Sequence, residues 1–321
     1  MHAVQYEAYG GGAAALKHVE IPIPIPKKGE LLVKLEAASI NPIDWKIQKG
    51  VIWPFLPRKF PFRPVTDVAG EVVEVGSGVD FKPGDKVVSF LSSSFLICGW
   101  TWAGRRFAEY AVASASKTAK RPAEVSAVEA AGLPVAGVTA LQTLKSAGIS
   151  FGSGGSEKAA NILVTAASGG VGLYAVQLAK LGNCHVTATC GARNLELVKN
   201  VGADEVLDYK TPGGAALESP SGKKYDAVIH CTTGIPWSTF EPNLAESGKK
   251  ITFSKKQLVP LLVIPKREDL EFLVGLVKEG KLKTVVDSRH PLSQAEAAWA
   301  KSIDGHATGK IVVEIGPPEA E

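Results

Sequence analysis

The spacing of apolar residues along the chain changes near residue 126. Before that point, β-branched runs bounded by glycine or turn residues predict strands over residues 31–37, 70–76 and 85–90. After it, strand-like runs alternate with helical spacings, a pattern typical of a parallel sheet with crossover helices. The expected helices here cover residues 173–181 and 195–201, and the expected strands cover residues 162–165, 185–190, 205–207, 227–231 and 250–253.

The two ends of the chain add further elements. The C-terminal segment predicts a helix over 269–282, a strand over 284–287, a helix over 295–302 and a strand over 311–315. Residues 21–26 alternate isoleucine and proline. Because proline has no N–H to donate, we expect this stretch to be extended or to lie at a sheet edge.

A run of small residues at 166–172 joins the first strand of the alternating part to its first helix. Its sequence is Ala-Ala-Ser-Gly-Gly-Val-Gly. In a dinucleotide-binding unit, such a turn lets the backbone bend sharply and aims N–H groups at a pyrophosphate. Glycine makes up 33 of the 321 residues, so the strand before the motif and the helix after it give the motif its weight.

The end of the second strand distinguishes between two cofactors. In NAD-binding units, an Asp or Glu about 20 residues after the glycine turn binds the ribose 2′-hydroxyl. Here the strand is followed by Gly191, Ala192 and Arg193, and no acid is present. Gly191 leaves room for a 2′-phosphate, which the Arg193 guanidinium can bind in two places. The sequence therefore predicts NADPH, while Arg193 also suits a solvated position that opens a helix.

Two further strand ends hold candidate cofactor contacts. Tyr209 follows the third strand, where it could pack on the adenine ribose or simply cover the sheet edge. Thr232 follows the fourth strand, and a doubly wound sheet binds its ligand beyond the carboxyl ends of its strands. Its neighbour His230 is interpreted as a structural histidine rather than a base.

Composition sets the broad class of the protein. The length of 321 residues suggests about two domains, and the contents of 45% hydrophobic and 21% charged residues are those of a soluble globular protein. The net charge is 36 − 32 = +4. No block of basic residues interleaved with aromatics points to nucleic-acid binding.

The four cysteines indicate neither a metal site nor a disulfide framework. Cys98, Cys184, Cys190 and Cys231 form no Cys-x-x-Cys pair, and no histidine cluster accompanies them. They are interpreted as small buried hydrophobes in a protein of a reducing compartment.

No segment looks like a membrane span or a cleaved leader. No apolar run reaches the roughly 18 residues that cross a bilayer. Residues 1–6 already have the pattern of a strand, so we expect neither a signal peptide nor a cleaved transit peptide.

An ordered series of motifs runs along nearly the whole chain and is more specific than any single motif. It consists of Ala3-Val4-Gln5-Tyr6, Tyr9-Gly10-Gly11, Asn41-Pro42-Ile43-Asp44-Trp45-Lys46, Asp67-Val68-Ala69-Gly70-Glu71-Val72, Phe81-Lys82-Pro83-Gly84-Asp85-Lys86-Val87, Phe107-Ala108-Glu109-Tyr110, Thr139-Ala140, the glycine turn, Gly202-Ala203-Asp204 and Gly309-Lys310-Ile311-Val312-Val313. With this series the chain resembles the zinc-free quinone oxidoreductase group of the medium-chain dehydrogenase/reductase superfamily.

The resemblance implies an α/β fold of two domains. A GroES-like, β-rich catalytic domain would comprise residues 1–125 and 268–321, and a Rossmann domain with a doubly wound parallel sheet would bind NADPH over residues 126–267. The implied reaction is hydride transfer from NADPH to the activated C=C of α,β-unsaturated carbonyls, long-chain oxidised lipids included, or to quinones. The implied cofactor contacts are Thr139, Ser168, Gly169, Gly170, Val171, Gly191, Arg193, Tyr209, Thr232 and Phe253.

The resemblance also bears on metal, assembly and location. The zinc-dependent relatives have Gly-His-Glu where this chain has Ala69-Gly70-Glu71, so the ligand histidine is missing and we expect no metal. Without a Lewis acid, alcohol oxidation is not expected, whereas a conjugated enone is already electrophilic at its β-carbon. Relatives form dimers by sheet pairing, and plant members imply a chloroplast location, peripheral at the inner envelope membrane.

Asn41, Asp44 and Lys310 are the candidate catalytic residues that the resemblance implies. Asn41 would donate an amide N–H to a carbonyl oxygen, Lys310 would stabilise developing negative charge, and Asp44 would hold one of them in place. From the residues alone, Asn41 before a proline also suits a turn, and Asp44 suits a helix cap.

The segment of residues 94–106 departs from the family pattern. It is longer and more apolar than the usual glycine-rich link, with Trp100 and Trp102 followed by Arg105 and Arg106. With residues 53–56 it could line a pocket for a long aliphatic substrate, touch a membrane surface, or pack as a loop over the core. The sequence leaves these three interpretations open.

Two other function classes make different demands on the chain. An NADPH-binding protein with little turnover would bind the cofactor without consuming it in the presence of enones and quinones. A short-chain dehydrogenase needs a Tyr-x-x-x-Lys pair, and none of the six tyrosines has lysine four residues later, which excludes that class.

Overall fold

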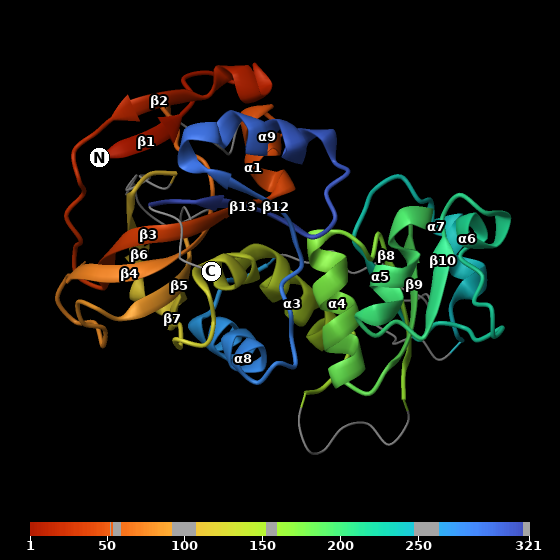
Figure 1. The fold of residues 1–321 in the computed structure, drawn as a ribbon. Coiled ribbons are helices and arrows are strands. Elements are labelled where there is room, and N and C mark those ends of the chain that lie inside the picture. The colour runs from red at the N-terminus through yellow and green to blue at the C-terminus, as the bar shows by residue number, and fades with distance from the viewer. Residues whose placement is uncertain (52, 54–58, 92–106, 152–158, 247–262, 317–321) are drawn as a thin grey trace. The chain divides into compact units, whose positions relative to one another are not determined.

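The computed structural model describes residues 1–51, 53, 59–91, 107–151, 159–246 and 263–316 of the chain. The chain forms two compact units (Figure 1). Unit 1 comprises Met1–Val138 and Ile264–Glu321, so it is built from both ends of the chain, and unit 2 comprises Thr139–Val263.

Unit 1 is organised around a seven-stranded sheet. Its strand order is β12-β13-β3-β4-β5-β7, with β6 paired to β3. β12 and β13 are parallel and the other pairs are antiparallel. The strands are β3 (Glu30–Ile40), β4 (Asp67–Val75), β5 (Lys86–Phe90), β6 (Tyr110–Ser114), β7 (Thr118–Lys120), β12 (Val286–Pro291) and β13 (Lys310–Glu314).

Strand β3 is the centre of this sheet. One of its edges pairs with β4, and it also pairs with two strands in succession, with β6 over residues 30–34 and with β13 over residues 37–40. Nearly all of its residues are buried, as expected for a strand with both faces covered. β3 therefore joins the N-terminal and C-terminal parts of unit 1.

Helices cover the two faces of the sheet (Figure 1). α9 packs on β3, β12 and β13, whereas α2 packs on β3, β4 and β5, and α8 packs on β7. The helices are α1 (Pro42–Gln48), α2 (Ala127–Ala131), α8 (Arg267–Lys278) and α9 (Ala295–Asp304). Short 3₁₀ and π turns occur at Gly12–Ala15, Ala115–Lys117, Leu133–Gly137 and Leu292–Gln294, and a separate two-stranded sheet consists of β1 (His2–Gln5) and β2 (Lys17–Glu20).

A buried tryptophan joins the two ends of the chain in the core of unit 1. Trp299 on α9 is fully buried, and its indole N–H donates to Gln48 Oε1 of α1 at 2.9 Å. The amide of Gln48 in turn donates to the Gly12 carbonyl at 2.9 Å. A large apolar ring is thus buried with its one polar atom satisfied, which is how tryptophan stabilises a core most effectively.

Unit 2 contains a parallel sheet with the strand order β10-β9-β8-β11. In chain order this is 3-2-1-4, the arrangement of a doubly wound nucleotide-binding sheet. The predicted α/β class, with a β-rich part and a parallel-sheet part, is confirmed. The strands are β8 (Asn161–Thr165), β9 (His185–Cys190), β10 (Glu205–Asp208) and β11 (Ala227–His230). The strand expected at 250–253 lies outside the described residues.

Helices connect the strands of unit 2. α4 packs on β8 and β9, and α5 packs on β9 and β10. The helices are α3 (Val138–Ser146), α4 (Gly170–Leu181), α5 (Leu195–Asn200), α6 (Pro212–Ala216) and α7 (Trp237–Phe240), with 3₁₀ turns at Ala192–Asn194 and Glu241–Asn243.

Two elements near the C-terminus differ from the sequence-based expectation. α8 ends at Lys278 rather than 282, because Gly280 adopts a left-handed conformation (φ 68°) that terminates the helix. The expected strand over 284–287 is instead β12 over 286–291, and the buried Thr284 hydroxyl donates to the Glu129 carbonyl at 2.9 Å. Tertiary contacts therefore outweigh local pattern here.

The close pairing of β4 with β3 predicts a strong effect of one methyl group. A Cβ on Gly70 would lie 2.1 Å from the Lys34 carbonyl oxygen, so Gly70→Ala should destabilise unit 1 by about 1–3 kcal/mol. Gly275→Ala on α8 is the matched control, because nothing lies within 4 Å of its Cβ position, and it should be neutral or stabilising. Thermal and urea unfolding measure both, and equal stability of the two variants would contradict the packing argument.

Candidate active site

A lysine and an asparagine from opposite ends of the chain meet inside unit 1. Ile311 of β13 pairs with Ile40 of β3, so the register brings Lys310 beside Asn41, the residue after β3. The Lys310 ammonium donates to Asn41 Oδ1 at 2.5 Å. Both residues are at most 3% exposed.

Asp67, the first residue of β4, is the third member of this cluster. Its Oδ2 accepts the Asn41 amide at 2.9 Å and the Ser39 hydroxyl at 3.2 Å, and it lies 3.6 Å from Lys310 Nζ. The sequence motif contains Asp67 without assigning it a role. An acid directly before the apolar Val68 and Ala69, at the start of the strand, is the signal that could have identified it.

Asp44 lies in the first turn of α1. Its Oδ2 accepts the backbone N–H of Asn41 at 2.7 Å, and Asn41 is the N-cap of α1. The local alternative for Asp44, a helix cap, is therefore present in the structure, whereas Asn41 is the N-cap of a helix rather than part of the turn that its proline neighbour suggested. The sequence-predicted trio Asn41, Asp44 and Lys310 is brought together.

Burial perturbs the charges of this cluster. Burial raises the pKa of Asp44 to about 7, while the N–H groups of Asn41 and Val65 and the Lys310 charge oppose the rise. Val65 has a left-handed backbone (φ 73°), rare for a β-branched residue. Burial also raises the pKa of Asp67 and lowers that of Lys310, and the attraction between these two opposes both shifts.

The hydrogen bonds assign different roles to Asn41 and Lys310. The Asn41 amide N–H groups face Asp67 and, at 3.5 Å, the Ser39 carbonyl. This differs from the expectation that Asn41 donates to a substrate oxygen. An ammonium has three donors, and among the described residues Lys310 donates one hydrogen bond, to Asn41 Oδ1, and forms an ion pair with Asp67 Oδ2 at 3.6 Å. Lys310 is therefore the group with a donor to offer.

The glycine turn of unit 2 has the geometry of a phosphate-binding loop. Residues 166–169 form the bend between β8 and α4, with Ser168 before the N-cap Gly169, and Gly170 and Val171 open the first turn of the helix. A Cβ on Gly172 would lie 2.5 Å from the Ala166 carbonyl oxygen, so only glycine lets the helix start this close to the strand. The N–H groups of the first turn of α4 have no partner within the helix, which suits an anion.

The ends of β9 and β10 lie side by side, as parallel pairing requires. Gly191 follows β9, and a Cβ there would touch the Tyr209 ring at 3.4 Å. Arg193 lies in the 3₁₀ turn after Gly191 and is exposed. Tyr209 is 54% exposed, and the Lys210 ammonium lies 5.8 Å from its ring centroid. No acid stands between Gly191 and Arg193, whereas Asp208, the last residue of β10, pairs with Cys190 at the end of β9.

The end of β11 holds Thr232, which is exposed in the turn after the strand. Its neighbour His230 has its Nδ1 2.9 Å from the Thr165 hydroxyl, which also accepts the Cys231 N–H at 3.1 Å. Burial lowers the pKa of His230. The imidazole of β11 is thus held by a hydrogen bond to Thr165 of β8, in agreement with a structural histidine.

The remaining predicted residues are less informative. Thr139 lies in α3, where its carbonyl accepts the Thr143 hydroxyl at 2.7 Å. Phe253 and the aromatic segment 94–106 lie outside the described residues, as do residues 54–56. Trp53 is described and is 69% exposed.

The cysteines of unit 2 are not reactive thiols. Cys184 and Cys190 are buried and Cys231 is half-buried. Burial raises the pKa of Cys190 to about 11 and that of Cys231 to about 12, so both stay protonated at neutral pH. Cys98 lies outside the described residues.

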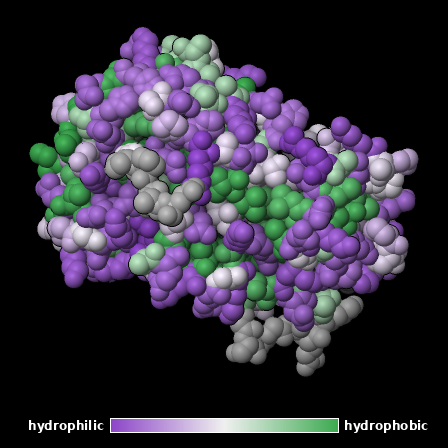
Figure 2. All heavy atoms as spheres, viewed as in Figure 1, coloured by the Kyte–Doolittle hydropathy of each residue, from purple (hydrophilic) through white to green (hydrophobic). Residues whose placement is uncertain are grey.

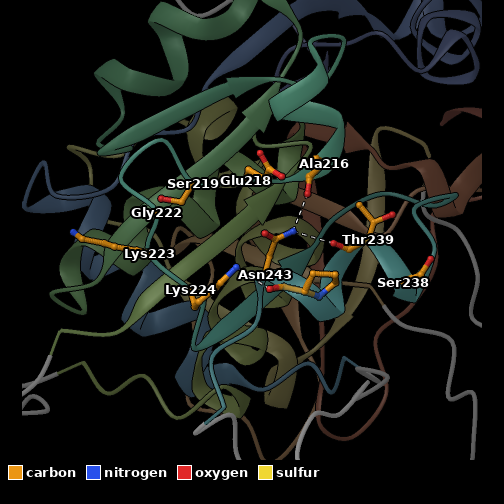
Figure 3. Close-up of a pocket in the computed structure, with 10 residues that line it drawn as sticks. Ala216, Glu218, Ser219, Gly222, Lys223, Lys224, Ser238, Thr239 and Asn243 are labelled. Carbon is orange, nitrogen blue, oxygen red and sulfur yellow. Dashed lines mark hydrogen bonds between the residues drawn. The ribbon is translucent and has the colours of Figure 1, made fainter.

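Unit 2 also contains a polar pocket, whose lining residues are drawn in Figure 3. Lys223 and Lys224 line it just before β11 begins, whereas the turn follows the end of β8. Because β8 and β11 are parallel, the pocket lies near the amino ends of the strands, whereas the glycine turn lies at their carboxyl ends. Asn243 is held there by the carbonyls of Ala216 and Thr239.

Most of the face shown in Figure 2 is hydrophilic, with apolar residues in smaller areas. In the described part of the chain, no helix is both long and apolar enough to span a bilayer.

Two protein families match the chain. "Alcohol dehydrogenase GroES-like domain" matches residues 27–123, and "Zinc-binding dehydrogenase" matches residues 201–313. The chain is 67% identical to the chloroplast envelope quinone oxidoreductase homolog of Arabidopsis thaliana, with 98% of both chains covered. It is 32% identical to the chloroplastic NADPH-dependent alkenal/one oxidoreductase of the same plant, over 98% of this chain and 79% of the relative.

Solved structures share the fold over the whole chain. The quinone oxidoreductase from Coxiella burnetii has a TM-score of 0.85 and 31% identity, covering 98% of this chain and 99% of the other. The Escherichia coli quinone oxidoreductase complexed with NADPH has a TM-score of 0.79 and 25% identity, covering 98% and 100%.

The zinc ion in one family's description finds no set of ligands in the described part of the chain. Within these ranges, no three His, Cys, Asp or Glu residues are grouped so that they could hold a metal. At Gly70, a side chain would strike the Lys34 carbonyl of β3. The expected absence of a metal stays a prediction.

The raised pKa of Asp44 predicts a pH-dependent effect on stability. The folded pKa of about 7 exceeds the unfolded value of about 3.9, so the folded state binds this proton more tightly. The stability that Asp44 contributes is present below about pH 4 and is lost as the pH rises to about 7. Asp44→Asn removes this dependence, so its stability relative to the wild type should rise by on the order of 4 kcal/mol across that range.

Urea unfolding at pH 4 to 8 measures this difference. Glu218→Gln, at an exposed carboxyl of unit 2, is the control and should follow the wild type. A constant difference between Asp44→Asn and the wild type across the range would contradict the buried, proton-binding state of Asp44.

Proposed function

The chain belongs to the medium-chain dehydrogenase/reductase superfamily, in its quinone oxidoreductase group, and we propose that it uses NADPH to reduce activated C=C bonds and quinones. The expected substrates are α,β-unsaturated carbonyls, long-chain oxidised lipids included. The observation that carries the substrate side of this proposal is the buried Lys310 ammonium, fixed by Asn41 and Asp67 and left with a donor for a substrate oxygen.

The residues of unit 2 fit a phosphorylated dinucleotide. The turn at Ser168–Val171 would hold the pyrophosphate on the N–H groups that open α4. The acid-free end of β9 and the Arg193 guanidinium suit a 2′-phosphate, which a carboxylate would repel. The E. coli quinone oxidoreductase is described in complex with NADPH, which supports the same cofactor here. When bound, the reduced nicotinamide supplies the hydride.

The chemistry of an enone requires a partner for developing negative charge. Hydride addition at the β-carbon moves the C=C electron pair toward the carbonyl oxygen, which becomes an enolate oxygen, and protonation at the α-carbon then completes the reduction. The Lys310 ammonium stabilises that oxygen, and it does so more strongly in a dry site than in water. A quinone develops charge on its oxygen in the same way, so one donor serves both substrate classes.

The remaining proposals concern location and assembly. The chloroplast names of the relatives support a chloroplast location, and we place the protein at the inner envelope membrane as a peripheral protein. A homodimer is proposed from the sheet pairing that relatives use. The substrate is a small molecule, and no nucleic acid is expected as a partner.

The cofactor assignment predicts a selective effect of Arg193→Ala. Loss of a charge-assisted pair costs about 1.5–3 kcal/mol, so the KM for NADPH should rise roughly 10- to 100-fold, while the KM for NADH should change little. Steady-state kinetics with both cofactors measures this. Lys199→Ala, at an exposed position on α5, is the control cation. Equal changes for NADPH and NADH would refute the assignment.

The substrate assignment predicts loss of turnover in Lys310→Ala. Removing one donor to a developing oxyanion typically lowers kcat by about 10²–10³-fold, and Asn41→Ala should cause a smaller loss because it only loosens the lysine. NADPH consumption with a panel of enones and quinones measures both. Lys278→Ala, at an exposed position on α8, controls for loss of positive charge.

Two outcomes would count against this assignment. Full turnover in both Lys310→Ala and Asn41→Ala would refute the site. Tight NADPH binding by the wild type without consumption on any substrate of the panel would favour the alternative function, a nucleotide-binding protein with little turnover.

A further inference from the structure

The carboxylate of Asp67 is the shared centre of the buried cluster in unit 1. It is fully buried. Its Oδ1 accepts the Val135 N–H at 3.1 Å and the Thr66 hydroxyl at 3.3 Å, and its Oδ2 accepts Ser39 and Asn41. These donors come from three places in unit 1: the segment of Ser39 and Asn41, the neighbouring residue Thr66, and Val135. The position of the carboxylate is therefore fixed independently of Lys310.

The position of Asp67 fixes the orientation of the Asn41 amide. A carboxylate only accepts hydrogen bonds and an ammonium only donates them. Asn41 lies between the two, so its Nδ2 must face Asp67 and its Oδ1 must face Lys310, as the distances of 2.9 Å and 2.5 Å show. The reversed amide would place two donors together and two acceptors together. Asp67 thus orients Asn41, and Asn41 orients Lys310.

Asp67 is also the nearest counter-charge of Lys310. Nζ lies 3.6 Å from Asp67 Oδ2, and neither side chain is more than 4% exposed. The charged groups that act on Lys310 come from two elements, Asp67 on β4 and Asp44 on α1, and Asp67 has the larger effect. Asp67 is therefore the stronger electrostatic partner of the ammonium.

We propose that Asp67 is a positioning residue of the reaction, which holds Lys310 protonated and aimed by way of the Asn41 amide. Asp67 itself is enclosed by protein donors, so it acts through the lysine rather than on a substrate. The role in turnover rests on the proposed function. The effect of Asp67 on the protonation of Lys310 is a property of the folded chain, and it can be measured without substrate or cofactor.

Asp67→Asn tests the proposal, because it keeps the shape of the side chain and removes its charge. Lysine Cε resonances of the ¹³C-labelled full-length chain report the titration of Lys310, assigned with Lys310→Met. Burial favours the neutral amine, so loss of the opposing charge should lower the titration midpoint of Lys310 by about 1–3 pH units. The alkaline limb of the kcat–pH profile should move down by the same amount.

Two further variants separate charge from orientation. Ser39→Ala removes one hydrogen bond to Asp67 but keeps the carboxylate, so the Lys310 midpoint should stay within about half a unit of the wild type. Asn41→Ala keeps the charge and removes the amide bridge, so the midpoint should again stay while kcat falls. If Asp67→Asn does not fold, as judged by circular dichroism, Asp67→Ser removes the same charge with a smaller side chain, and the Lys310 midpoint should fall in the same way.

Failure of the proposed role of Asp67 and failure of the proposed function give different results. An unchanged Lys310 midpoint in folded Asp67→Asn would overturn the role of Asp67, as would unchanged kcat in Asn41→Ala with an active wild type. If the Lys310 midpoint falls in Asp67→Asn but the wild type consumes no NADPH with any enone or quinone, the electrostatic role of Asp67 is confirmed and the proposed function is refuted.

Discussion

The antiparallel pairing of β13 with β3 is the constraint on which the site of unit 1 depends. Lys310 and Asn41 are 269 residues apart in sequence, and they meet because Ile311 pairs with Ile40. Successive side chains of a strand point to opposite faces, so a slip of one residue would turn Lys310 to the other face of the sheet. The apolar residues Ile311, Val312 and Val313 are all buried, which makes such a slip costly. Packing of the core thereby sets the position of a charge.

Placing that charge inside a sheet has an energetic consequence. Two carboxylates and an ammonium leave water together, and desolvation of such groups is repaid only when every donor and acceptor is used. The structure meets this condition at Asp67, whose two oxygens accept four hydrogen bonds. At Asp44 the condition is met partly by a strained residue, because Val65 in the left-handed region directs its N–H to that carboxylate. The cluster favours a defined geometry over maximal stability.

Sequence alone indicated the elements whose signals are local. The strand, small-residue turn and helix at 161–181 are contiguous, so their order could be predicted, and the structure has β8 and α4 there. The neutral end of β9 could likewise be recognised from a few neighbouring residues. Motif resemblance identified Asn41, Asp44 and Lys310 as a set.

The parts that sequence did not indicate depend on contacts between distant segments. Nothing near Asp67 in the chain shows that Ser39, Asn41 and Val135 converge on it. The direction of the Asn41 amide also follows only from having a carboxylate on one side and an ammonium on the other. β12 was misplaced for the same reason, since its bounds are set by pairing with β13 rather than by its own residues.

The tight approach of β4 to β3 at Gly70 limits which residues this position can hold over evolutionary time. A Cβ there would lie 2.1 Å from the Lys34 carbonyl oxygen, a backbone atom that cannot rotate away as the end of a side chain can. Replacing Gly70 would therefore require β3 and β4 to move apart, and β3 also pairs with β13, which carries Lys310. This glycine thus links the evolutionary constraint on the backbone to the geometry of the charged cluster.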